Sequence, residues 1–328
     1  MVKPKVGKYS EVTCPCYCFL ITHPSGRNLL FDLGVRKDWE NYAPALVSRI
    51  KQGGWGVSVE KDVATILEEN GIQGKDIEGI IWSHYHWDHT GDPTRFPAST
   101  ALIVGPGFKS RFPTAYPTDE KAPLTEDAWA DRELREISFS SNSGLKIGRF
   151  NAFDFFGDGS FYLLDTPGHL LGHLCGLART TADTFIFMGG DAAHHAGEIR
   201  PTEYVPLPHE ITLSPPLPEY FPHVCPGEII LSELHPEKSA TKPFYRAAEG
   251  FNEDTQVAEW TIEGVSEFDA HERVLTVVAH DSSLMDVVDF FPKTANDWRS
   301  KEWGRDGRWR FLADFSKGLE EARKTGRL

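Results

Sequence analysis

Short apolar runs alternate along the chain with segments whose apolar residues recur at helical spacing. A strand near Cys16–Thr22, a short turn and a strand Asn28–Asp32 predict an early hairpin. A helix is expected near Val59–Asn70, with Ser58 as its N-cap, and a strand Glu78–Trp82 follows it. Strands that alternate with helices are typical of the α/β class.

The same alternation continues through the rest of the chain. A short helix is expected at Glu126–Ile137 and a longer one near Glu253–Phe268. Further apolar runs predict strands at Ala101–Val104, Ser160–Leu164, Thr184–Met188 and Val274–Ala279. A helical stripe close to the C-terminus is expected to pack on the body of the protein, and it consists of Phe311, Leu312, Phe315 and Leu319.

We predict one domain over residues 1–328, because no Pro/Gly/Ser-rich linker and no repeat divides the chain. Loop insertions are expected near 93–123 and 200–270, where proline and aromatic residues gather. A C-terminal helical extension is expected near 297–324.

Composition narrows the class of protein. The 328 residues are 40% hydrophobic and 12% aromatic, which is enough for a substantial core. Lys and Arg number 34 against 48 Asp and Glu, and the net charge of −14 argues against binding to nucleic acid or anionic membranes. The sequence has neither a membrane-spanning apolar stretch nor a secretory signal. We therefore expect a cytoplasmic protein that acts on a small molecule, with its oligomeric state left open.

Three of the five cysteines, Cys14, Cys16 and Cys18, stand two positions apart and therefore on one side of an extended strand. A metal or redox site is one interpretation. A zinc site would need a matching pair elsewhere, and only Cys175 and Cys225 remain. We expect buried thiols that pack as small hydrophobic groups.

Residues 84–89 read His-Tyr-His-Trp-Asp-His, directly after an apolar strand. Imidazole and carboxylate groups are costly to bury together without a cation, and they suit zinc, iron, manganese or cobalt. His84 and His86 can point the same way from an extended backbone. A turn after them can send Asp88 and His89 toward a second ion.

Three other predicted strands end in the same kind of side chain, namely His169, Asp191 and His280. Ligand sites in α/β sheets gather beyond the ends of strands, so these groups are expected to meet. Two choices arise. The loop after Leu164 offers both His169 and His173. His235 also follows an apolar run, but His280 is preferred because it follows a cleaner strand.

Taken in order, these motifs resemble the metallo-β-lactamase superfamily: the H-x-H-x-D-H loop, Thr166–His169, Gly190-Asp191 and Ala279–Asp281. The resemblance covers about residues 12–285 and implies an αββα sandwich with a dinuclear metal site at the sheet edge. It also implies a ligand set: His84, His86 and His169 for one metal, Asp88, His89 and His280 for the other, and Asp191 as a bridge between them. The family pattern favours His169 over His173, which is then expected to pack or to orient a ligand.

Within the superfamily the chain is most similar to the quorum-quenching N-acyl homoserine lactonases. That branch often carries Tyr three residues after the bridging Asp, where this chain has His194. The resemblance implies a hydrolase in which a metal-bridging hydroxide attacks the carbonyl of a lactone or ester. Two divalent ions are expected, zinc by preference and otherwise iron, manganese or cobalt. Asp88 is the candidate proton shuttle, and His194 either donates to the carbonyl or orients a ligand.

Two other functions stand beside this one: a thioesterase of the glyoxalase II type, and a mononuclear iron oxidoreductase similar to persulfide dioxygenases. The substrate is expected to carry a hydrophobic acyl or aromatic part if the loop aromatics roof the metals. The alternative is a purely structural role, in which these aromatic side chains pack their loops against the rest of the protein. They are Phe108, Phe112, Tyr116, Tyr204, Tyr220 and Phe221.

Overall fold

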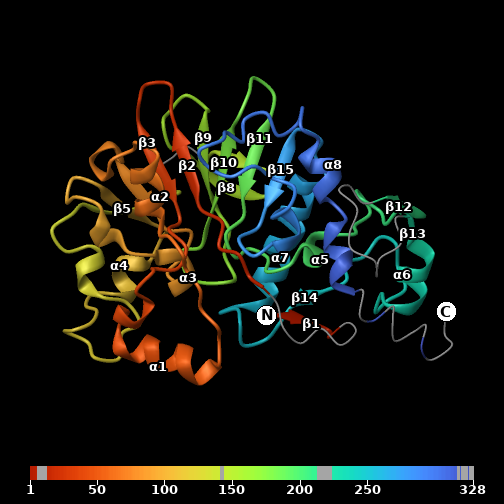
Figure 1. Ribbon diagram of the computed structural model, residues 1–328, viewed down its shortest axis with the longest axis horizontal. Coiled ribbons are helices and arrows are strands. Elements are labelled where there is room, and N and C mark those ends of the chain that lie inside the picture. Colours follow the sequence, from red (N-terminus) through yellow and green to blue (C-terminus); the bar gives the residue numbers. More distant parts are fainter. Residues whose placement is uncertain (6–12, 141–143, 213–223, 316–317, 319–323, 325–328) are drawn as a thin grey trace.

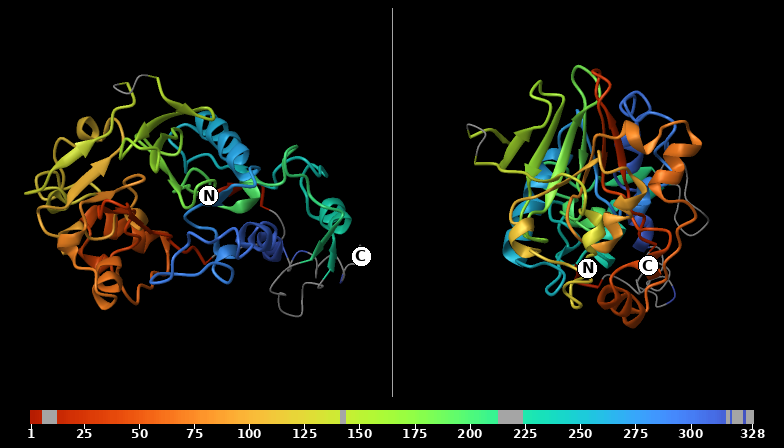
Figure 2. Two further views of the ribbon diagram at one scale, coloured as in Figure 1. Left: turned by 90° about the horizontal axis from the view of Figure 1, so that it is seen from above. Right: turned by 90° about the vertical axis from the view of Figure 1, so that its left-hand side faces the viewer.

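The computed structural model describes residues 1–5, 13–140, 144–212, 224–315, 318 and 324 of the chain. In this part of the chain two β-sheets stack on each other, and helices lie on their outer faces (Figures 1 and 2). The predicted α/β class and its αββα sandwich are confirmed.

The first sheet comes from the N-terminal part of the chain. In spatial order its strands are β2 (Phe19–Thr22), β3 (Asn28–Phe31), β4 (Gly79–Ile81), β5 (Ala101–Val104) and β6 (Leu134–Glu136). β2 and β3 are antiparallel, and the later neighbours are parallel. Because side chains alternate along a strand, Leu29 and Phe31 enter the core between the sheets. Leu30 points the other way and packs with Leu67 of α2 (Val63–Glu69).

The second sheet uses the middle and later parts of the chain. Its order is β15 (Val274–Val277), β11 (Phe185–Met188), β10 (Leu174–Arg179), β9 (Phe161–Asp165), β8 (Phe150–Asp154) and β7 (Lys146–Ile147). Helix α7 (Thr255–Asp269) covers the outer face, where Ile262 and Val265 pack with Leu164 and Phe187. β15 is parallel to β11, so the loops after these two strands leave from the same edge.

Two short ribbons complete the strands that the structure describes: β1 (Val2–Lys3) with β14 (Arg246–Ala247), and β12 (Glu210–Thr212) with β13 (Val224–Pro226). The other α-helices of this part of the chain are α1 (Pro44–Gly53), α3 (Trp87–Thr90), α4 (Phe108–Arg111), α5 (Ala196–Ile199), α6 (Gly227–Glu233) and α8 (Trp303–Gly307). No helix among the described residues is long and apolar enough to cross a membrane.

The helix predicted at Glu126–Ile137 is wrong. A short 3₁₀ turn occupies Glu126–Ala128, and the chain then enters β6, which pairs in parallel with β5. Asp131, with φ of 62°, turns the backbone between the two elements. Pairing with the neighbouring strand therefore outweighs the local helix propensity, and it carries the buried Ile137 into the core between the sheets.

The helix predicted at Val59–Asn70 exists but begins later, at Val63. Its N-cap is Asp62, whose carboxylate accepts a hydrogen bond from the backbone N–H of Thr65 at 2.7 Å, and not Ser58. On α7, Ile262 and Val265 are buried, whereas Trp260 is 42% exposed. It lies against Arg149, whose guanidinium sits 5.3 Å from the ring centre.

Several elements were not predicted, among them α1, β8 and β10. β10 is buried along almost its whole length between β9 and β11, so its sequence shows no alternation of apolar and polar residues. The C-terminal stripe forms a 3₁₀ helix, Arg310–Phe315, in which Phe311 and Phe315 pack against Phe244. Leu319 lies outside the described residues.

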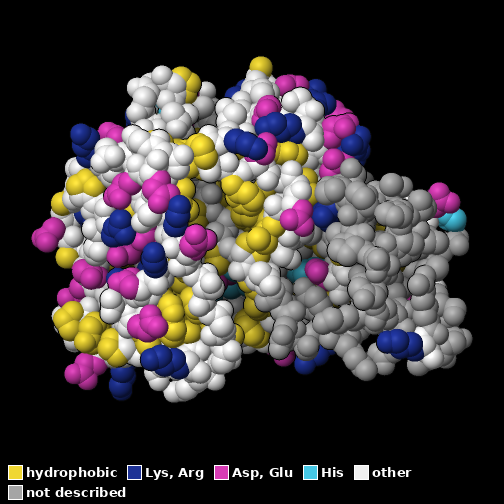
Figure 3. Space-filling model, in the orientation of Figure 1, with side chains coloured by type: hydrophobic (Ala, Val, Ile, Leu, Met, Phe, Trp, Pro, Cys, Tyr) yellow, Lys and Arg dark blue, Asp and Glu magenta, His cyan; other side chains and the backbone are white. Residues whose placement is uncertain are grey.

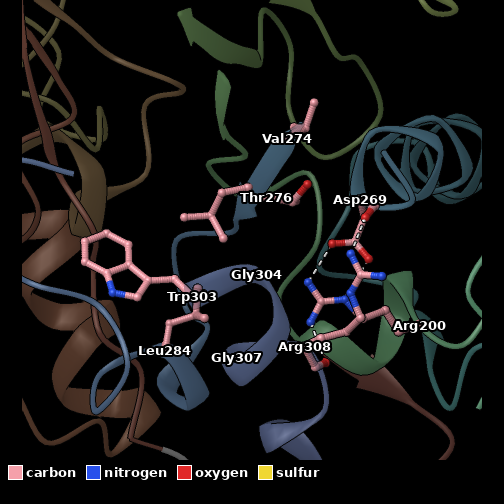
Figure 4. Close-up of a pocket in the computed structure, with 10 residues that line it drawn as sticks. Arg200, Asp269, Val274, Thr276, Leu284, Trp303, Gly304, Gly307 and Arg308 are labelled. Carbon is pink, nitrogen blue, oxygen red and sulfur yellow. Dashed lines mark hydrogen bonds and ion pairs between the residues drawn. The ribbon is translucent and has the colours of Figure 1, made fainter. Parts of the chain in front are cut away.

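A small pocket lies between β15 and α8 (Figure 4). Beside it, Arg200 donates from Nε and Nη2 to the two carboxylate oxygens of Asp269, at 2.7 and 2.6 Å, and from Nη1 to the carbonyl of Arg308. This buried bidentate pair ties the residue after α5 to the C-terminal end of α7. None of the predicted metal ligands lines this pocket.

Candidate metal centre

The structure brings all seven predicted ligands together where strands of both sheets end. His84 follows β4, and α3 carries Asp88 and His89 with His86 as its N-cap residue. The other three ligands follow β9, β11 and β15 in the second sheet, and they are His169, Asp191 and His280. Ligand atoms of His84, His86, His169 and Asp191 lie within 4.8 Å of one another, and so do those of His89, Asp191 and His280.

Asp191 stands between the two groups. Its Oδ2 lies 3.7 Å from Nε2 of His84 and 3.6 Å from Nε2 of His169. Its Oδ1 lies 3.1 Å from Nε2 of His89 and 3.0 Å from Nε2 of His280. Asp191 is 3% exposed, and each of its carboxylate oxygens faces a different set of imidazoles. This is the arrangement that a carboxylate shared by two cations requires.

In the first group, three imidazole nitrogens converge. Nδ1 of His86 lies 2.9 Å from Nε2 of His84 and 3.1 Å from Nε2 of His169. Nδ1 of His169 donates to Oδ1 of Asn252, so its Nε2 presents a lone pair to the group. Burial lowers the pKa of His84 and His169 well below the usual value, so both rings are neutral. Lone pairs that face one another in a buried site fit a cation between them.

In the second group, outer hydrogen bonds set the orientation of two rings. Nδ1 of His89 donates to Oδ2 of Asp32 at 2.9 Å, and Nδ1 of His280 donates to the carbonyl of Pro15 at 2.8 Å. When neutral, both rings therefore turn an Nε2 lone pair toward Oδ1 of Asp191. Among the described residues, Nε2 of His89 and Oδ1 of Asp191 have no hydrogen-bond partner. Two acceptors facing each other in a buried site again fit a cation.

The electrostatics of the second group agree with this geometry. Burial alone would lower the pKa of His89 and His280, but the groups around them, the Asp191 carboxylate first among them, together outweigh burial and hold both pKa values well above normal. Asp88 adds to this field from Oδ2, 3.5 Å from Nε2 of His280. A proton on these rings thus stands where a cation would otherwise sit, and metal binding would release it.

Asp32 and Ser83 support the site and were missed from the sequence. Asp32 accepts hydrogen bonds from the backbone N–H of Ser83 at 2.6 Å and from its hydroxyl at 2.7 Å, besides the one from His89. It is 1% exposed and has φ of 61°, a left-handed conformation uncommon outside glycine. The available signal was its place after an apolar strand, which it shares with the predicted ligands.

His173 lies beside the cluster without entering either ligand group, as expected. Its Nε2 accepts a hydrogen bond from the backbone N–H of Asp191 at 3.0 Å, and Nδ1 donates to the hydroxyl of Thr166 at 2.9 Å. Burial lowers the pKa of this imidazole to about 3, so the ring stays neutral.

The loop that carries His169 needs Gly168, because a Cβ there would lie 2.2 Å from the backbone nitrogen of Ala258.

His235, the rival to His280, lies away from both ligand groups. Its Nε2 donates to the carbonyl of Lys242 at 2.7 Å, and its ring packs on Phe244, with 4.6 Å between ring centres. Its Nδ1 accepts from the backbone N–H of Glu237 at 3.1 Å. Both ring nitrogens are therefore used within one local turn after α6.

His194 lies at the rim of the first group. Its Nε2 is 3.4 Å from Oδ2 of Asp191, and its ring centre is 4.9 Å from that of His169. Its backbone N–H donates to the buried carboxylate of Glu198 at 2.6 Å. The next residue, His195, points away from the cluster and toward Asp314, at 3.1 Å. Of this His-His pair, His194 faces the predicted ligands.

The aromatic side chains of the loops were expected either to cover the metal site or to pack their loops against the rest of the protein. Phe108 is 3% exposed and packs on Trp82 and Tyr85, so it pins its loop to the body beneath the metal-binding loop. Tyr204 is 60% exposed, and Tyr220 and Phe221 lie outside the described residues. Apolar side chains also gather near the middle of the face in Figure 3, where histidine is visible at depth.

The cysteine run differs from its prediction. Cys14 is exposed, and Cys16 and Cys18 are half-buried, whereas Cys175 is buried. A ligand atom of Cys16 lies within 4.8 Å of those of Asp88 and His280.

Comparison with known proteins identifies the family. Residues 12–105 match the model of the metallo-beta-lactamase superfamily. The chain is 46% identical to Gamma-lactamase FDB1 of Fusarium pseudograminearum, over 98% of this chain and 79% of the relative. It is 45% identical to Metallo-hydrolase mfmC of Annulohypoxylon moriforme, over 97% of this chain and 83% of the relative. The chain belongs to the metallo-β-lactamase superfamily.

A solved structure shares the fold. It is an N-acyl homoserine lactone hydrolase with the product N-hexanoyl-L-homoserine at its catalytic metal centre. The TM-score is 0.53 at 17% identity, over 85% of this chain and 86% of that one. Family, fold and the histidine–aspartate cluster together define a metal-dependent hydrolase whose site suits divalent metal ions.

Proposed function

We propose that this chain is a dinuclear metal hydrolase that opens a lactone ring or cleaves a related ester. The observation that carries the proposal is the position of Asp191, whose two oxygens face different imidazole groups. His84, His86 and His169 would hold one ion, and Asp88, His89 and His280 the other. Zinc is the favoured metal, because imidazole and carboxylate donors suit it.

When bound, two such ions supply a hydroxide nucleophile near neutral pH and polarise the carbonyl of the substrate. The chain's own groups supply the rest. The side chain of Asp88 is 21% exposed and lies 3.5 Å from Nε2 of His280, so one of its oxygens can pass a proton to the leaving group. His194 can donate from Nε2 to the oxygen that becomes charged.

A second candidate substrate class is a γ-lactam, favoured by the 46% identity to a relative named as a gamma-lactamase. The two bonds make different demands on the site. An alkoxide can leave an ester with metal support alone, whereas an amine must take a proton as the C–N bond breaks. A lactam substrate would therefore depend more strongly on Asp88 than a lactone does.

The test combines metal analysis with a substrate panel. Protein purified without chelator should contain about two metal ions per chain, from the two ligand groups. It should then be assayed on lactones, aryl esters, γ-lactams and thioesters that carry an acyl or aromatic group. Hydrolysis of thioesters alone would favour the glyoxalase II-type alternative. One iron per chain with oxygen uptake and no hydrolysis would favour the dioxygenase-like alternative and sink the dinuclear proposal.

A further inference from the structure

The run Cys14–Cys18 is anchored beside the second ligand group. The backbone N–H of Tyr17 donates to the carbonyl of Ala279 at 3.2 Å, and the hydroxyl of Tyr17 donates to the carbonyl of Asp281 at 3.0 Å. His280 donates from Nδ1 to the carbonyl of Pro15 between these contacts. Three hydrogen bonds thus hold the extended segment against the loop that carries His280.

This anchoring brings one thiol among predicted ligands. Sγ of Cys16, a carboxylate oxygen of Asp88 and a ring nitrogen of His280 lie within 4.8 Å of one another. Ligand atoms that share a tetrahedral zinc lie about 3.3–3.8 Å apart, given bonds of about 2.0–2.3 Å. Small side-chain movements therefore suffice for the three atoms to share one ion.

The two flanking cysteines differ in their surroundings. Sγ of Cys18 lies 3.5 Å from the carbonyl of Cys16, to which it donates, and 3.4 Å from the point where a Cβ on Gly34 would stand. Cys14 is exposed. Of the cysteines that the structure describes, only Cys16 belongs to one of the groups of possible metal ligands.

The unpaired atoms of the second group supply an independent argument. Nε2 of His89 and Oδ1 of Asp191 are buried and have no hydrogen-bond partner among the described residues. Both point to the place that His280 also faces. A cation at this place would satisfy them, and it would lie beside the Asp88 and Cys16 donors.

We propose that Cys16 binds, as its thiolate, the metal ion held by Asp88, His89 and His280. The inference rests on the proposed dinuclear function. Binding deprotonates the thiol, and the proton passes to solvent with no change of oxidation state. A sulfur donor makes the second site softer than the first, so it should select zinc or cobalt over manganese or magnesium more strongly.

The test uses the full chain reconstituted with cobalt(II). A thiolate–cobalt bond gives an intense near-ultraviolet charge-transfer absorption that imidazole and carboxylate ligands do not give. We expect this band in the native protein, its loss in Cys16→Ser, and its retention in the matched control Cys14→Ser. Cys16→Ser should also weaken cobalt binding at one of the two sites by at least about tenfold, the lower end of effects seen for groups that merely support ligands.

A second measurement needs no variant and so does not depend on folding of a mutant. Alkylation of Cys16 by iodoacetamide, followed by peptide mass spectrometry, should be at least about tenfold slower in the metal-loaded protein than in the metal-free protein. Alkylation of the exposed Cys14 should change far less.

The outcomes separate the two proposals. A native protein that binds two cobalt ions without the charge-transfer band overturns the role of Cys16 and leaves the dinuclear hydrolase standing. A band lost in Cys14→Ser but kept in Cys16→Ser also overturns it. If the native protein takes up only one cobalt ion, the dinuclear function is contradicted. The presence or absence of the charge-transfer band then still shows whether Cys16 binds that ion.

Discussion

The imidazole of His173 accepts a hydrogen bond from the backbone N–H of Asp191, with 3.0 Å between the two nitrogens. His173 therefore acts on the carboxylate through the main chain, and the side chain of Asp191 stays free to face both imidazole groups. Removing one or the other should have very different consequences.

Asp191→Ala should reduce metal content from about two ions per chain to below about one and abolish hydrolysis, because both proposed ions lose a shared ligand. His173→Ala should retain metal and keep measurable hydrolysis, since it removes contacts to the backbone of Asp191 and to Thr166 but no proposed ligand. Elemental analysis and initial rates on one substrate measure both effects. Equal metal loss in the two variants would mean that His173 matters as much as the carboxylate itself.

Asp32→Asn should weaken binding at the second site. Asp32 accepts three hydrogen bonds through two carboxylate oxygens, whereas an amide offers only one acceptor oxygen to Ser83 and His89. We expect the affinity for one of the two ions to fall about 10–100-fold, as measured by competition with a chelator. Asp158→Asn, at a surface turn, is the matched control and should bind both ions normally. Equal weakening at both sites would argue against a specific role for Asp32.

His194→Phe tests the group that replaces the tyrosine of the lactonases. If Nε2 donates to the developing oxyanion, kcat should fall about ten- to a thousandfold while metal content holds. His194→Tyr should restore part of the rate, because a phenol can donate from a similar place. Loss of metal in His194→Phe would instead assign the residue to support of Asp191, and an unchanged kcat would remove it from the mechanism.

We expect the free energy of unfolding to depend on pH through His235, independently of the metal centre. Burial lowers the pKa of His235, and its Nδ1 accepts a backbone hydrogen bond only when the ring is neutral. Below about pH 6.5, the usual histidine pKa, the unfolded chain binds this proton more readily than the folded protein. The stabilisation is thus fully present above that pH and is lost as the pH falls toward the lowered pKa.

The measurement compares the wild type with His235→Gln, in which an amide can keep one donor and one acceptor. Urea unfolding at about pH 7.5 and 5.5 should show a smaller loss of stability in the variant, by up to about 1.4 kcal/mol for the pH unit below 6.5. The metal content of His235→Gln should match the wild type. Loss of a metal ion in this variant would reopen the choice between His235 and His280.

The sequence by itself determined the class of fold and the neighbourhood of each proposed ligand. His84, Asp191 and His280 all follow apolar strands, and residues just beyond parallel strand ends meet at one edge of a sheet. These signals are local, since a strand and the residues after it can be recognised within about ten positions. The strands and the ligands that follow them could therefore be predicted without knowledge of any tertiary contact.

Tertiary structure alone decided which groups orient those ligands. His89 and Asp32 are 57 positions apart, and His280 and Pro15 are 265 apart, so no local pattern links them. The same holds for Cys16, which the sequence placed in the core and the fold places beside Asp88. The strand β6 was predicted as a helix for a related reason: its conformation depends on pairing with β5, and such pairing is a property of the assembled sheet.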